Sequence, residues 1–120
     1  MAIRYGQCFV VLGGDASQEA WSDIYNHFDG QLPKVNLLKA SHHGRDSGFH
    51  LESVKAMQPD HVVVSVGKKP ETDASDKYRA QANNGVYSTR FHGTITAQCY
   101  EDGTVLLWDR DEKLINKQKE

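Results

Sequence analysis

Three short apolar runs constrain the fold of this chain more than any other feature of the sequence. They are QCFVVLGG (residues 7–14), VNLLKA (35–40) and HVVVSV (61–66), all rich in aliphatic residues. Helical patterns separate them, and strands that alternate with helices favour a largely parallel sheet joined by right-handed crossovers. We therefore expect an α/β protein.

Three helices are expected in the segments that follow these strands. Residues 17–28 form an amphipathic pattern, residues 47–57 form a second that Ser47 could cap, and residues 73–84 form a more polar third. The first helix carries aromatic side chains at helical spacing, which we expect in the core: Trp21, Tyr25 and Phe28.

The last third of the chain predicts three more strands, at residues 86–89, 93–101 and 103–110. Asp102-Gly103 joins the last two and is a strong hairpin signal. The element order is then β-α-β-α-β-α-β-β-β. This order predicts one mixed sheet with its helices on one face.

The composition describes one globular domain. The chain has 120 residues, of which 38% are hydrophobic and 25% are charged. Its net charge of −2 gives no sign of a general nucleic-acid-binding surface. We expect a single domain over residues 1–110, followed by a charged tail over residues 111–120 that frays.

The cysteines and the apolar runs bear on the compartment. Cys8 and Cys99 lie far apart in strand-like runs and form no CxxC motif, which favours reduced, buried thiols. The longest apolar stretch, residues 8–12, is far shorter than the roughly 20 residues of a membrane span. The start of the chain lacks the apolar region of a signal peptide. We expect a cytoplasmic protein with no membrane partner.

Polar loops follow the first three strands. These loops are GGDAS (13–17), SHHGRDS (41–47) and GKKPETD (67–73), and in this topology all three emerge at the same edge of the sheet. That edge is where α/β proteins bind ligands. The side chains expected to converge there are Asp15, His42, His43, Lys68 and Lys69.

Each of these residues has a structural alternative. Asp15, with Gln18 three residues later, resembles a helix-capping pair. The adjacent imidazoles of His42 and His43 before Gly44 favour a functional loop, because glycine lets the backbone approach a ligand closely. The two lysines are a solvated turn unless a phosphate lies nearby. The remaining histidines are expected to be surface, capping or strand-edge residues: His27, His50, His61 and His92.

Four motifs, taken in order, resemble one known family. They are GGDAS, LLKASHHGRDSG, HVVVSVG and NNGVYSTRFHGTITA, and they cover the chain from about residue 5 to residue 107. In this order and spacing they resemble the C-terminal half of a metallo-β-lactamase-fold hydrolase. The subgroup they resemble most is typified by the hydrolase domain of ComEC-type DNA-uptake proteins, with choline-phosphate esterases as relatives.

The resemblance implies roles for three residues. Asp15 and His43 would be metal ligands, and His42 would support them or donate a proton as a catalytic group. A carboxylate and an imidazole suit zinc or manganese, and a metal-activated water would attack a phosphodiester.

This sequence departs from the family pattern in two ways, and these differences determine which function we expect. The family's main metal motif, HxHxDH, belongs to the N-terminal half and is not in this sequence, and two protein ligands do not hold a catalytic centre. Asp73-Ala74 also stands where the subgroup often carries His-Pro.

The complete fold is an αββα sandwich, so half of it would leave an apolar sheet face that needs a cover. That cover could be a second copy, an N-terminal half on another chain, or a rearranged helix or tail. We therefore expect a partial domain that is not an independent enzyme and acts as a homodimer or with a partner. The alternative is a metal-dependent phosphodiesterase or nuclease-like hydrolase that an N-terminal half on another chain completes. A phosphate or nucleic-acid binder is the least favoured hypothesis.

Overall fold

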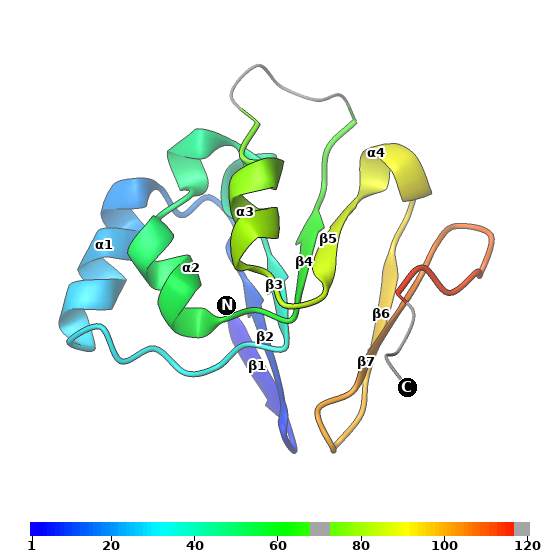
Figure 1. Cartoon of the computed structure of the whole chain (residues 1–120), viewed down its shortest axis with the longest axis horizontal. Coiled ribbons are helices and arrows are strands. Elements are labelled where there is room, and N and C mark those ends of the chain that lie inside the picture. The colour runs from blue at the N-terminus through cyan, green and yellow to red at the C-terminus, as the bar shows by residue number, and fades with distance from the viewer. Residues whose placement is uncertain (68–72, 117–120) are drawn as a thin grey trace.

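A computed structural model describes residues 1–67 and 73–116 of the chain (Figure 1). It confirms the α/β class, with a mixed five-stranded sheet whose three longer helices gather on one face, while the short last helix lies apart from them beyond the fifth strand (Figure 1). The prediction of one continuous sheet is wrong. The C-terminal hairpin forms a separate two-stranded sheet that packs on the other face of the main sheet.

The main sheet has its strands in the order β1-β2-β3-β4-β5, so sequential strands are neighbours. Strands β2 to β5 are parallel, while β1 pairs antiparallel with β2 and was not expected from the sequence. Gly6 turns the chain between β1 and β2 with a left-handed φ of 58°. The strands are β1 (Ala2–Tyr5), β2 (Cys8–Leu12), β3 (Leu37–Lys39), β4 (His61–Val64) and β5 (Gly85–Ser88).

The helices are shorter than the sequence pattern predicts. None of those described is long and apolar enough to cross a membrane. Two 3-10 turns, η1 and η2, precede α2, and η2 covers the first residues of the segment where the sequence predicts the second helix. The elements are α1 (Gln18–His27), η1 (Ser41–Gly44), η2 (Asp46–Gly48), α2 (Leu51–Met57), α3 (Ser75–Gln81) and α4 (Thr89–His92).

The caps of α1 and α2 differ from those expected. The Ser17 side chain caps α1 by accepting a hydrogen bond from the backbone N–H of Ala20, so the capping role considered for Asp15 is wrong. His50, one of the histidines expected to cap a helix, caps α2, and the prediction of Ser47 as its cap is wrong. Because Ser17 caps α1, the Asp15 side chain is left for another role.

The larger core lies between the helices and the sheet. Leu38 and Val62 of the sheet pack there with Trp21 of α1 and Tyr78 of α3. Burial raises the pKa of Tyr78 to about 12, although a hydrogen bond with Ser41 opposes this shift. Phe28, expected in this core, is 54% exposed because α1 ends at His27.

The smaller core lies on the helix-free face of the sheet, under the hairpin of β6 (Thr96–Cys99) and β7 (Val105–Trp108). Its buried members are Cys8 and Leu37 from the sheet and Val105 and Leu107 from β7. The tail was expected to fray after Arg110, yet residues 111–116 fold back along β7. There Asn116 is 3% exposed, accepts a hydrogen bond from the Leu107 N–H and donates one to the Val105 carbonyl.

Candidate functional site

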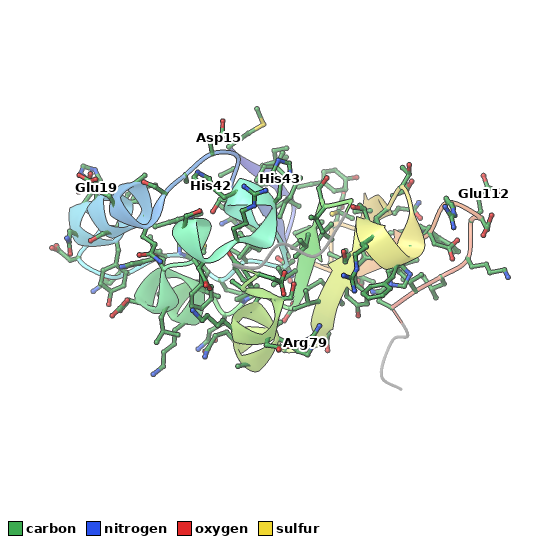
Figure 2. All side chains as sticks on the ribbon, turned by 90° about the horizontal axis from the view of Figure 1, so that it is seen from above. Asp15, Glu19, His42, His43, Arg79 and Glu112 are labelled. Carbon is green, nitrogen blue, oxygen red and sulfur yellow. The ribbon has the colours of Figure 1, made fainter. Side chains whose placement is uncertain are left out.

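The loops that follow β2 and β3 lie against each other at the carboxyl end of the sheet. The Gly13 N–H donates to the Lys39 carbonyl over 2.9 Å, and the His42 N–H donates to the Gly14 carbonyl over 3.0 Å. Figure 2 shows Asp15, His42 and His43 along this edge, which we call the rim. The structure thus brings the three residues of the predicted site together, while Lys68 and Lys69 lie outside the described residues.

A buried serine fixes the base of the rim. The Ser41 hydroxyl accepts a hydrogen bond from the Trp21 indole N–H over 3.0 Å and donates one to the Gly48 carbonyl over 2.8 Å. A Cβ at Gly13 would lie 2.8 Å from the Ser41 Cβ, and one at Gly48 would lie 2.7 Å from the Ser41 Oγ. The glycines on both sides of the histidine pair are therefore needed for this close packing.

The histidine pair has a strained backbone. His42 and His43 have φ values of 49° and 53°, in the left-handed region, and Gly44 follows with φ 78°. Left-handed conformation costs a residue with a side chain on the order of 1–3 kcal/mol, and such strain is concentrated at functional sites. A Cβ at Gly44 would lie 2.6 Å from the Val64 Cγ1, so glycine is required there for steric reasons too.

The His42 imidazole joins the two loops. Its Nε2 lies 2.6 Å from the backbone carbonyl oxygen of Asp15, and its Nδ1 lies 2.9 Å from the Ser47 Oγ. Because a carbonyl can only accept, Nε2 carries the proton, and the Ser47 hydroxyl can donate to Nδ1. Both ring nitrogens are thus occupied, which gives His42 a positioning role toward the Asp15 loop. Its predicted catalytic role stays a prediction.

The His43 imidazole has the opposite arrangement. Its Nδ1 donates to the Ser65 carbonyl over 2.6 Å, and no hydrogen bond from the described residues reaches Nε2. The side chain is exposed. This bond fixes the tautomer that metal-binding histidines use, with one nitrogen donating to a carbonyl and the other holding a free lone pair.

Thr89 holds the Ser65 loop in place. Its hydroxyl accepts a hydrogen bond from the Val66 N–H over 2.9 Å and donates to the Val66 carbonyl over 3.1 Å. The sequence predicts Thr89 at the end of a strand and Ser47 as a helix cap, and it assigns neither side chain to the rim. The available signal was their place inside the motifs YSTRFHG and SHHGRDS.

The donor set of the rim fits part of a metal site only. The Asp15 side chain is exposed and has no hydrogen bond to the described residues, and the His43 Nε2 is free, so each could give one ligand. Within residues 1–67 and 73–116, however, no three His, Cys, Asp or Glu side chains lie close enough together to hold a metal ion. Zinc in proteins takes three or four protein ligands. The described rim therefore does not form a complete centre.

Asp73 does not complete the set. Its carboxylate accepts hydrogen bonds from the Ser75 N–H over 3.3 Å and the Ser75 hydroxyl over 2.8 Å at the start of α3, and its backbone forms an isolated bridge with Arg45. Asp73 thus serves the local structure of α3.

Comparisons of the chain with models of protein families, with curated proteins and with solved structures find no match. The resemblance to a metallo-β-lactamase fold therefore depends on the motifs quoted above. A functional hypothesis has to explain the geometry of the rim, where the Asp15 carboxylate and the His43 Nε2 are both free to bind a metal.

Proposed function

We propose that this chain is one half of a metallo-β-lactamase-like αββα sandwich, that it is not an independent enzyme, and that it works as a homodimer or with a separate N-terminal half. The observation that carries the proposal is the rim. Asp15 and His43 extend free donor atoms there from a strained and hydrogen-bonded frame, but the described residues supply only these two.

The helix-free face of the sheet supports the need for a partner. Ile3 and Tyr5 of β1 pair with Val10 and Cys8, so their side chains belong to the same face as the smaller core. They are 47% and 53% exposed, so the β6–β7 hairpin covers this face only in part. A partner that covers β1 would bury both side chains, which is a gain of roughly 25 cal/mol for each Å² of apolar surface removed from water.

The alternative function is a metal-dependent phosphodiesterase or nuclease-like hydrolase that an N-terminal half on another chain completes. The His43 tautomer fits it, because Nδ1 donates to a carbonyl and leaves the exposed Nε2 lone pair available to a metal. Asp15 and His43 would hold zinc or manganese, and the metal would supply Lewis acidity and an activated water. His42 would keep the Asp15 loop in position through the Asp15 carbonyl.

We place the half-domain in the cytoplasm, since Cys8 and Cys99 are both free thiols, as a reducing compartment requires. The chain's slight net negative charge of −2 makes a nucleic-acid partner the least favoured of the candidates.

The decisive experiment measures mass and metal content together. Sedimentation equilibrium should give a dimer of the 13.5 kDa chain, or a monomer that forms a complex when an N-terminal half-domain carrying HxHxDH is added. A monomer that remains alone with every such half-domain would contradict the proposal.

Metal titration of the assembled species tests the rim, with hydrolysis of bis-p-nitrophenyl phosphate as the activity readout. Asp15→Ala and His43→Ala should each remove metal binding. His27→Ala is the matched control, because His27 is an exposed imidazole at the end of α1, within the helical layer. Equal metal affinity in wild type and in both rim variants would exclude Asp15 and His43 as ligands.

A further inference from the structure

A polar cavity of about 500 Å³ lies at the end of the sheet opposite the rim. The residue directly before each of four strands lines it: Gln7 before β2, Asn36 before β3, Asp60 before β4 and Asn84 before β5. The turn of the β6–β7 hairpin, with Asp102 and Thr104, closes the other side. The cavity thus lies where the amino ends of the parallel strands face the hairpin, and its volume is within the usual range of small-molecule sites.

His61 gives this cavity an unsatisfied group. The residue is only 7% exposed and its side chain lines the cavity, yet its Nδ1 is buried without a hydrogen-bond partner. No hydrogen bond from the described residues reaches either ring nitrogen. A buried polar atom without a partner costs about 1–3 kcal/mol, and in folded proteins such atoms are few and generally have a functional explanation.

The charge of the cavity wall favours cations. Among the described lining residues there are two carboxylates and no lysine or arginine. Asp60 is paired with Lys34 at 2.7 Å. Asp102 has no ion-pair partner among the described residues, and hydrogen bonds from Thr104 lower its pKa, so it is ionised at neutral pH. Burial lowers the pKa of His61, so the imidazole adds no positive charge.

Two side-chain amides complete the wall. Gln7 and Asn84 line the cavity, and neither side chain makes a hydrogen bond with the described residues. Each offers a carbonyl oxygen that can accept from a ligand. The free groups of the wall are therefore one carboxylate and two amides, next to a neutral imidazole whose Nδ1 is buried.

We propose that this cavity binds a small organic cation that carries N–H donors, such as a primary amine or a guanidinium. The cation lies against the Asp102 carboxylate and donates to the amide oxygens of Gln7 and Asn84, beside the neutral His61 ring. An anion such as phosphate is excluded by the charge of the wall. A metal ion is disfavoured because no three ligating side chains among the described residues come together.

This site lies apart from the rim, and the two sites can be tested independently. It lies at the amino ends of the strands and Asp15 and His43 at the carboxyl ends, so the rim variants should leave amine binding unchanged. Failure of either proposal thus leaves the other standing.

The test is a titration of the full chain, followed by ¹H–¹⁵N NMR, with agmatine as the probe. Agmatine carries both a guanidinium and a primary amine. Tetramethylammonium, a cation without N–H donors, and acetate, an anion, are the matched control ligands. Agmatine should shift the amide signals of Gln7, Asn84 and Gly103, and it should bind at least tenfold more tightly than either control.

Asp102→Asn is the decisive variant. Asparagine before Gly103 keeps a favourable hairpin turn and can still accept from the Thr104 N–H, so the fold is retained while the charge is lost. The affinity for agmatine should fall about tenfold, and Asn84→Ala should lower it by a smaller factor. Glu112→Gln, an exposed carboxylate beyond β7, should change nothing. Equal binding of agmatine and tetramethylammonium, or an Asp102→Asn affinity equal to that of wild type, would overturn the proposal.

Discussion

The two faces of the five-stranded sheet differ in kind. The helix-covered face carries the larger core, whose sheet residues are aliphatic and whose polar groups pair internally, as Trp21 does with Ser41. The hairpin-covered face holds a smaller core together with a buried thiol, an unpartnered imidazole and a polar cavity. It also leaves Ile3 and Tyr5 of β1 exposed.

This difference teaches where the molecule's interactions are concentrated. On the helix-covered face the buried polar groups are paired, and the exposed Ile24 and Phe28 belong to α1 and its C-terminal end, not to the sheet. The hairpin-covered face has exposed apolar side chains and unpaired polar atoms. Both features are typical of a surface that binds a partner or a ligand. The predictions below test this contrast, from the largest expected effect to the smallest.

The largest expected effect comes from truncating neighbouring leucines of β3. Leu38 faces the helices and is 1% exposed, while Leu37 faces the hairpin and is 6% exposed. Leu38→Ala should lower the free energy of unfolding by about 4–5 kcal/mol and Leu37→Ala by about 2–3 kcal/mol, because the hairpin can move to fill the space left at Leu37. Urea denaturation of both variants measures the difference. Equal losses would mean that the two faces are equally well packed.

The second prediction concerns the thiols of the hairpin-covered face. Burial and the neighbouring Cys99 and Asp102 raise the pKa of Cys8 from 9.0 to about 12. At pH 8 the Cys8 thiolate is therefore rarer by roughly a thousandfold than in an unperturbed cysteine, since each pKa unit is a factor of ten.

Alkylation with iodoacetamide, read by mass spectrometry of peptides, should thus modify the half-buried Cys99 well before Cys8. In urea both cysteines should react at similar rates. Modification of Cys8 at the rate of Cys99 in the folded protein would show that the hairpin opens readily.

The third prediction removes the side chain that ties the tail to β7. Asn116→Ala leaves the Leu107 N–H and the Val105 carbonyl without their partner, which should cost about 1–3 kcal/mol. Asn26→Ala, an exposed asparagine on α1, is the control and should change stability by less than about 0.5 kcal/mol. Denaturant midpoints measure both. A neutral Asn116→Ala would mean that the tail contributes nothing to the hairpin sheet.

The smallest effect is a pH dependence from His61. Burial lowers its pKa in the folded state below the unfolded value of 6.5, so the unfolded chain binds the proton first. The stability contribution of the neutral imidazole is present above pH 6.5 and is lost as the pH falls through the folded-state pKa. Urea midpoints between pH 7.5 and pH 5 should fall more for the wild type than for His61→Gln. Parallel pH profiles would contradict a buried neutral imidazole.

The sequence could predict the parallel core of the fold but not its margins. The aliphatic runs at residues 7–14, 35–40 and 61–66 each contain a strand, because continuous apolar character marks a strand buried on both faces. Strand β1 was missed because its four residues are all exposed and carry no burial pattern. The separate hairpin sheet was missed since strand runs alone do not specify which strands pair.

At the rim, the sequence could predict convergence but not the detailed arrangement. Topology alone indicated that Asp15 and the histidine pair share an edge, and the contact of His42 with the Asp15 carbonyl agrees with this. The different roles of the two imidazoles depend on successive left-handed residues, a conformation that propensity does not predict outside glycine. The cap at Ser17 was missed because Asp15 and Ser17 are both good capping residues two positions apart.

The way the tail folds back along β7 gives the hairpin two unlike edges. Leu114 and Ile115 lie alongside the outer side of β7, and Asn116 satisfies the backbone groups of Val105 and Leu107, so that side offers no room for another strand. Strand β6, whose Thr96, Ala97 and Gln98 are exposed, pairs only with β7 among the described strands. A strand from a second copy or from another protein would therefore add to this small sheet along β6 and not along β7.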